Sequence, residues 1–136
     1  MFLQQIRVTV PRFIVSVQNM NLTTEQLPNG VEKIALAGRL DTAGAQEIDL
    51  PFTRFTATRS ALIVVDLSQV SFLASMGIRT LLANAKALGR RGGRMVLASP
   101  QPLVEEVLKI AGIDELIPVY ADVASACLGL SSPAES

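Results

Sequence analysis

The stretch Asp66-Leu-Ser-Gln-Val-Ser-Phe-Leu-Ala-Ser-Met-Gly-Ile78 joins two different hydrophobic patterns. It starts at the end of Ala61–Leu67, a continuous apolar run that is typical of a central strand buried on both faces. Beyond it, apolar residues recur with the spacing of one helical face, at Ile78, Leu81, Leu82, Ala85 and Leu88. The sequence therefore predicts a buried strand, a short step at Val70–Phe72, and a helix over Ser75–Leu88 whose stripe packs against the strand.

Upstream of this stretch, the chain shows a hairpin and a helix. Pro28-Asn29-Gly30 separates the β-like runs Asn21–Leu27 and Val31–Ala37, which predicts a hairpin because Asn and Gly tolerate positive φ. Asp41 can cap the helix that follows it. We expect that helix to break or kink near Asp49–Pro51, since proline cannot donate to the residue four positions back, and then to continue through Phe52 and Phe55.

Downstream, strand-like and helix-like segments continue to alternate. Arg94–Ala98 predicts a strand, and Ser99-Pro100 is expected to cap the next helix, which Gly112 stops. The apolar stripe of that helix is Val104, Val107, Leu108 and Ala111. Leu116–Tyr120 predicts a last short strand, and Asp122 can cap a final helix in which Val123 and Cys127 share a face.

The order of elements is therefore β-β-α-β-α-β-α-β-α, which is the pattern of an α/β domain. A further strand is allowed within Phe13–Val17. We divide the chain into an N-terminal arm or extra strand over residues 1–19, one domain over residues 20–128, and a frayed, small and polar tail over residues 129–136.

Composition excludes several classes of protein. The 136 residues contain no histidine and one cysteine, Cys127, which argues against a disulfide framework, the common zinc sites and histidine-based catalysis. We interpret Cys127 as a small buried apolar residue. No apolar run reaches the roughly 20 residues that span a bilayer, so we expect no membrane insertion. Lys+Arg and Asp+Glu are each 12, so the net charge is zero, which disfavours nucleic-acid binding.

The charges are nevertheless unevenly distributed along the chain. No Asp or Glu lies between Asp66 and Glu105, and this interval holds the basic residues Arg79, Lys86, Arg90, Arg91 and Arg94. Such a run is either a solvated face or a docking stripe that steers an acidic partner.

The stretch from Asp66 to Ile78 resembles the hallmark of STAS domains, specifically of bacterial anti-sigma-factor antagonists. In that family a buried strand ends in Asp-Leu-Ser/Thr, a Val-x-Phe-hydrophobic step follows, and Asp-Ser, a small residue, Gly and Leu open a helix. Gly38-Arg39-Leu40-Asp41 resembles the family's Gly-x-Leu-Asp, and Val104–Gly112 resembles its penultimate helix. The resemblance implies a STAS-like mixed β-sheet with about four helices, mainly on one face.

The resemblance also implies a function. The family's phosphorylated serine falls on Ser75. The unphosphorylated protein would sequester an anti-sigma factor with serine kinase activity and so release a sigma factor. Phosphorylation of Ser75 would end this binding, and a phosphatase would restore it. The protein would then be a cytoplasmic phosphoprotein and a kinase substrate rather than an enzyme, without a cofactor or a metal; a homodimer is left open.

We expect the partner-binding surface to surround Ser75. Its members are Asp41, Asp66, Ser68, Ala74, Met76, Gly77 and Arg79. Structural interpretations stand beside these roles: Ser75 and Asp41 as helix N-caps, Gly77 as a close-packing residue or one that admits a partner's backbone. Asp66, at the expected end of its strand, either faces a kinase or accepts from amides around Ser68 and Val70.

Two positions depart from the family's pattern. Ala74 stands where the family usually has Asp, and Met76 where it often has Ser or Thr. These departures favour an alternative function, a non-phosphorylated STAS scaffold subunit of a transporter or another regulatory complex. A third interpretation is a minor nucleotide-binding role, as suggested for some relatives.

Overall fold

The computed structural model describes residues 14–16, 20–57 and 61–131, and side chains from Met20 onward. The described elements are β1 (Ile14–Ser16), β2 (Met20–Gln26), β3 (Val31–Leu40), α1 (Thr42–Ala57), β4 (Leu62–Leu73), α2 (Ser75–Arg90), β5 (Arg94–Ala98), α3 (Pro102–Ile110), β6 (Val119–Tyr120) and α4 (Val123–Ser131). This order confirms the predicted one, with β1 preceding it. Most of the N-terminal arm and of the tail lies outside the described residues.

The sheet is mixed, and its strands follow one another in chain order from β1 to β6. β1, β2 and β3 pair antiparallel, and β3, β4, β5 and β6 pair parallel. The predicted hairpin is confirmed: β2 and β3 are joined at Pro28–Gly30, where Asn29 and Gly30 adopt φ of 68° and 76°. The parallel half brings the ends of β3, β4 and β5 to one side of the molecule, and the start of α2 lies there.

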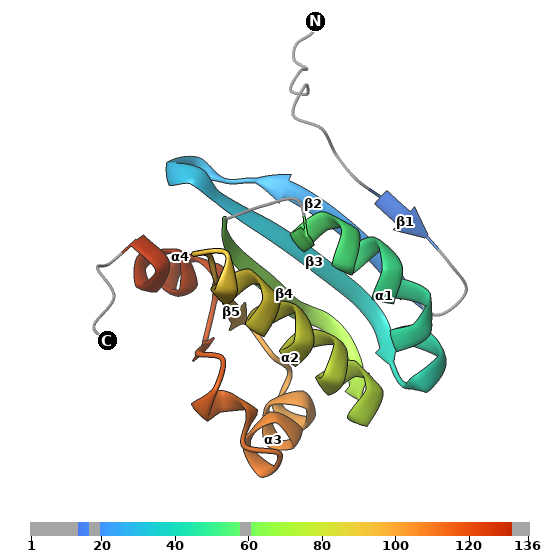
Figure 1. The fold of residues 1–136 in the computed structure, drawn as a ribbon. Coiled ribbons are helices and arrows are strands. Elements are labelled where there is room, and N and C mark those ends of the chain that lie inside the picture. Colours follow the sequence, from blue (N-terminus) through green and yellow to red (C-terminus); the bar gives the residue numbers. More distant parts are fainter. Residues whose placement is uncertain (1–13, 17–19, 58–60, 132–136) are drawn as a thin grey trace, which may run out of the picture.

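Alternation along β4 builds two hydrophobic layers, as expected for a strand buried on both faces. Ile63 and Val65 belong to the larger core, which includes buried residues of α1, α2 and α3. Val64 faces the opposite way, into a smaller cluster with Ala126 and Leu130 of α4. α1, α2 and α3 thus cover one face of the sheet, and α4 covers the other (Figure 1). Cys127 is half-buried against this smaller cluster.

Three predicted boundaries are wrong. α1 is not interrupted at Pro51, although it continues through Phe52 and Phe55 as expected, because Ile48, Phe52 and Phe55 on either side of the proline bury one common face in the core. β4 runs on to Leu73 and includes the expected short step, because pairing with β3 continues to its end. α3 starts at Pro102, not at Ser99-Pro100.

The late start of α3 has a local cause. Ser99 still donates its backbone N–H to the carbonyl of Tyr120 and has a positive φ of 60°, so it lies outside a helix. Pro102 takes the first helical position instead, which suits proline. Gly112 follows the helix with φ of 75°, as expected, but Ala111 is exposed rather than part of the buried stripe. The last strand is limited to Val119–Tyr120.

α2 buries a different set of residues from the apolar stripe that the sequence predicts. Leu81 and Leu88 are fully buried, but Ile78, Leu82 and Ala85 are half-buried at the margin of the core. The polar residues Thr80 and Asn84 are buried in their place. They can be buried because α1 supplies partners: the Thr56 hydroxyl donates to Asn84 Oδ1 at 2.6 Å, and the Thr80 hydroxyl to Asp49 Oδ1 at 3.4 Å.

The final helix is capped as predicted. The backbone N–H of Ser125 donates to Asp122 Oδ1 at 2.7 Å. Hydrogen bonds from the backbone and side chain of Ser125 hold the pKa of the exposed Asp122 carboxyl below its usual value. Among the described helices, none combines the length and the hydrophobicity needed to cross a bilayer.

A chain that begins at Met20 should fold and keep the order β2 to β6. β1 adds three described residues at the sheet edge, whereas Met20 and Leu22 of β2 are buried by the rest of the core. Urea unfolding of residues 20–136, followed by circular dichroism, should show a cooperative transition near that of the full chain. Loss of cooperativity would show that residues 1–19 belong to the folded unit.

Candidate functional site at the start of helix α2

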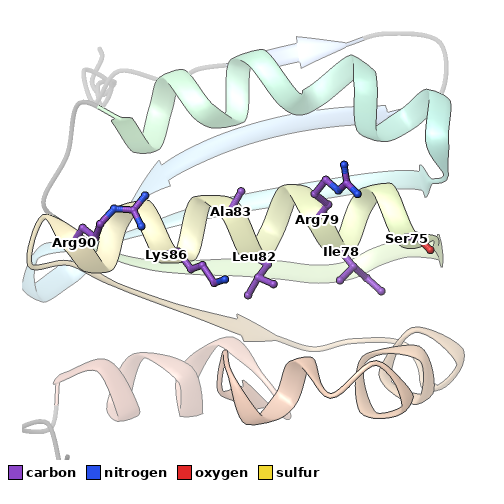
Figure 2. A pocket seen from close by; sticks show the side chains of 7 residues that line it. All are labelled: Ser75, Ile78, Arg79, Leu82, Ala83, Lys86 and Arg90. Carbon is purple, nitrogen blue, oxygen red and sulfur yellow. The ribbon is translucent and has the colours of Figure 1, made fainter.

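Ser75 is the first residue of α2 and is exposed, at the same end of the molecule as the loop between β3 and α1 (Figures 1 and 2). The predicted role of Ser75 as N-cap is wrong, because Ala74 occupies the cap position with an extended backbone. Alanine has no side-chain acceptor, so the free amides of the first turn are not capped by a side chain. The Ser75 hydroxyl is therefore not used in capping and points away from the core.

The backbone around Ser75 is held in place by its neighbours. The Ala74 N–H donates to the Leu40 carbonyl at 2.9 Å, which ties the start of α2 to the end of β3. Gly77 is buried, and a Cβ there would lie 2.6 Å from Leu40 Cγ and 2.9 Å from Leu73 Cδ1. This contact supports the close-packing interpretation of Gly77. The first turn of α2 is thus seated directly on the ends of β3 and β4.

Asp41 caps α1, as predicted. The Gly44 N–H donates to Asp41 Oδ1 at 2.8 Å, and Asp41 Oδ2 lies 3.5 Å from Arg39 Nε. The Arg39 guanidinium in turn stacks over the half-exposed ring of Phe72, 4.4 Å from its centroid. These contacts link the β3–α1 connection to the end of β4. A direct contact of Asp41 with a partner stays a prediction.

Asp41→Ala should lower the free energy of unfolding by about 1 kcal/mol, the usual cost of losing an N-cap. The conservative variant Asp41→Asn keeps a side-chain oxygen for the Gly44 amide and should retain most of the stability. Urea titrations of the two variants against the parent measure the difference. Equal losses in both would mean that the charge, through Arg39, matters more than the cap.

Asp66 and Ser68 lie apart from Ser75. Asp66 is in the interior of β4, not at its end, because β4 continues for seven residues beyond it. Its Oδ1 accepts the Ser68 N–H at 3.0 Å, and the Ser68 carbonyl accepts from Gln101 Nε2 at 2.9 Å. The structural interpretation of Asp66 is therefore confirmed for Ser68, and this pair organises the connection from β5 to α3 rather than the start of α2.

A groove of about 510 Å³ runs along α2 from Ser75 toward the helix end (Figure 2). Its lining residues are Ser75, Ile78, Arg79, Leu82, Ala83, Lys86 and Arg90. The apolar members form its middle, and three cations accompany them. Sequence analysis singled out Ser75 and Arg79, which the structure brings together, but placed Ile78 and Leu82 in the core. In the sequence, the polar residues Thr80 and Asn84 were the signal that could have shown this, because their burial turns Ile78 and Leu82 toward the edge of the core.

The other residues singled out from the sequence surround this groove or lie elsewhere. Met76 is half-buried and lines a second hollow, of about 330 Å³, which Asp49 of α1 and Arg79 also line. Arg91 is engaged with the carbonyl of Thr56, and Arg94 lies in β5. The basic run of the sequence is thus divided, with Arg79, Lys86 and Arg90 on the groove.

The sequence of the chain is similar to those of two anti-sigma factor antagonists. The chain is 29% identical over 100 residues to BtrV of Bordetella bronchiseptica, a candidate anti-sigma factor antagonist; the match covers 74% of this chain and 85% of BtrV. It is 27% identical over 103 residues to the anti-sigma F factor antagonist of Paenibacillus polymyxa, covering 74% and 88%.

Solved structures share the fold. SpoIIAA in its unphosphorylated form superposes with a TM-score of 0.68 at 21% identity, over 84% of this chain and 99% of SpoIIAA. The phosphorylated form of Bacillus SpoIIAA gives 0.60 at 22% identity, over 79% and 97%. The STAS domain family model matches residues 24–126, from β2 into α4. The chain belongs to the STAS domain family.

Proposed function

We propose that the protein is an anti-sigma factor antagonist that is switched by phosphorylation of Ser75. Unphosphorylated, it binds an anti-sigma factor that is also a serine kinase, and a sigma factor is released. The names of the relatives support the antagonist role, and the solved phosphorylated and unphosphorylated forms of SpoIIAA fit a modification switch on this fold. The protein is then a substrate of the kinase and of a phosphatase, in the cytoplasm.

The single observation that carries the proposal is the exposed, uncommitted hydroxyl of Ser75 at the first position of α2. A helix N-terminus presents free amides and the positive end of the helix dipole, so a phosphate is accepted there without unfolding. Phosphate adds roughly −1.5 to −2 charges at neutral pH. Modification therefore changes the surface that a partner meets while the fold stays intact.

The proposed partner surface is centred on Ser75 and includes Met76 and Arg79, its exposed or half-exposed neighbours. Ala74 and Asp41 border this surface, because the hydrogen bond from Ala74 to Leu40 holds the residue before Asp41 next to the start of α2. Gly77 contributes by letting the helix seat closely, and Asp66 with Ser68 is the most distant part of the proposed surface. The binding unit is residues 20–128.

A second candidate is a non-phosphorylated scaffold subunit of a transporter or regulatory complex. It is favoured by Ala74 and Met76, which replace the side chains usual beside the family's phosphorylated serine. A kinase that requires a carboxylate at the position of Ala74 would leave Ser75 unmodified.

A kinase assay separates these two functions. The purified chain is incubated with ATP and each candidate anti-sigma kinase from its source organism, and the modified residue is located by mass spectrometry. Modification at Ser75, absent in Ser75→Ala, is the expected result. A kinase that binds the chain but leaves Ser75 unmodified would contradict the switch and favour the scaffold.

A further inference from the structure

The groove along α2 has a charge that nothing in its lining balances. Arg79, Lys86 and Arg90 are exposed, and no carboxylate lines the groove. Ion pairs among the described residues include Lys33 with Glu25, Arg39 with Asp41, and Lys109 with Glu105, and none of these pairs engages the three groove cations. The middle of the groove is apolar, formed by half-buried Ile78 and Leu82 together with Ala83.

We propose that this groove receives a segment of the anti-sigma partner that carries both carboxylates and apolar side chains. Phosphorylation of Ser75 then weakens binding of this segment, because the phosphate pairs with Arg79. The inference rests on the proposed function, which it makes more specific. Charge complementarity selects the occupant: an acidic segment gains from three unpaired cations, and its apolar side chains cover Ile78 and Leu82. A basic or purely polar segment gains from neither feature.

Arg79 is the groove cation within reach of a phosphate on Ser75. Residues four positions apart lie on one face of a helix, with Cβ atoms about 5–6 Å apart. Long side chains in helices lean toward the N-terminus, which directs Arg79 toward Ser75. A guanidinium pairs with two phosphate oxygens at once. Lys86 and Arg90 lie about 16.5 Å and 22.5 Å from Ser75 along the helix axis at 1.5 Å per residue, too far to share the contact.

A phosphate on Ser75 would lower the positive charge of the groove and would occupy one of its hydrogen-bond donors. A phosphate of about −2 cancels roughly two thirds of the positive charge on the three cations. It also holds the Arg79 guanidinium, which is then not offered to a partner carboxylate. The effect is local to one end of α2, so it needs no movement of the helix.

The charged groups around Ser75 leave this pairing open. From β3 and the connection to α1, Arg39 and Asp41 face one another at 3.5 Å. From α1, Asp49 lines the neighbouring hollow with Arg79 and accepts from the Thr80 hydroxyl. None of the ion pairs named above joins Asp49 to Arg79, so the Arg79 guanidinium stays available to a phosphate, which would be the stronger ligand because it carries two charges.

The first experiment needs no kinase and no partner. Phosphoserine is incorporated at position 75 during synthesis, and its second pKa is measured by ³¹P NMR in the full chain. That pKa should be lower in the parent than in Arg79→Gln by about half a unit. Arg90→Gln removes the same charge from the far end of the groove and should change the pKa by less than about 0.1 unit. Equal values in the parent and Arg79→Gln would overturn the role of Arg79.

The second experiment tests the occupant, with the anti-sigma factor identified in the kinase assay. Ala83→Glu places a carboxylate in the groove centre on an exposed position, and Ala83→Gln is its neutral control of the same shape. Ala83→Glu should weaken binding at least about tenfold relative to Ala83→Gln. In the parent, binding should weaken with salt more steeply than in Arg90→Gln.

Two results would overturn the docking proposal: equal binding by the two Ala83 variants, or self-association of the parent in sedimentation experiments that Ala83→Glu abolishes and Ala83→Gln does not. If no anti-sigma factor binds the parent at all, the proposed function fails and the docking proposal fails with it. The pKa measurement still decides whether Arg79 pairs with the phosphate, so the two failures are distinguishable.

Discussion

Leu81→Asp should unfold the domain, whereas the same substitution at the next residue, Leu82→Asp, should leave it folded. Leu81 is fully buried in the core between α2 and the sheet. A carboxylate there has no partner and costs several kcal/mol, which is a large share of the roughly 5–15 kcal/mol that stabilise a domain. Leu82 is half-buried on the open groove, where an aspartate can reach water, so we expect a loss of about 1 kcal/mol or less.

Circular dichroism with urea titration measures both variants under the same conditions. The pair is matched because the substitutions are identical, adjacent and on one helix, so helix propensity cancels between them. If both variants melted like the parent, α2 would not pack against the sheet in this orientation. If Leu82→Asp were the more damaging, the buried face would be the one that the sequence pattern predicts.

Ser75→Asp should weaken binding to the anti-sigma partner by about 100-fold, equivalent to about 2.7 kcal/mol. The substitution places a negative charge at the centre of the proposed interface, where it would repel the carboxylates of the partner and compete with them for Arg79. The fold should be unaffected or slightly stabilised, since a negative charge at a helix N-terminus is favourable by roughly 0.3–1 kcal/mol. The unfolding transition should therefore stay at or above that of the parent.

Two controls separate charge from shape. Ser75→Asn has nearly the size of the aspartate without its charge, and Ser75→Ala removes the hydroxyl; both should bind far better than Ser75→Asp. Isothermal titration with the purified partner gives the affinities. Equal loss in Ser75→Asp and Ser75→Asn would mean that steric fit, not charge, controls the interface. No loss in any of the three would place the interface elsewhere.

Local signals account for most of what the sequence predicts correctly. The hairpin at Pro28–Gly30 follows from residues that tolerate positive φ, and the capped helix starts after Asp41 and Asp122 follow from single carboxylates that reach nearby amides. The buried strand before Asp66 follows from a continuous apolar run, because a strand with one solvent-exposed face would alternate apolar and polar residues. Each of these signals is contained within a few residues.

The errors arise where distant residues decide the outcome. The buried face of α2 includes Asn84 because Thr56, 28 residues earlier, supplies its hydrogen bond. The end of β4 lies beyond Asp66 because β3 continues to pair with it. The site shows the same division: the spacing of Ser75 and Arg79 on one helix is readable from sequence, but the half-buried position of Ile78 and Leu82 beside the groove depends on how α2 is turned against α1.

The lengths of the outermost described strands have a consequence for how the protein behaves at high concentration. β1 and β6 consist of three and two residues. A long, flat outer strand would present a row of unpaired amides and carbonyls, onto which strands of other molecules could add and grow into aggregates. Within residues 14–16, 20–57 and 61–131, such short edge strands offer little template for growth of this kind. We therefore expect concentrated solutions to stay clear on storage, without the fibrous precipitates that open sheet margins promote.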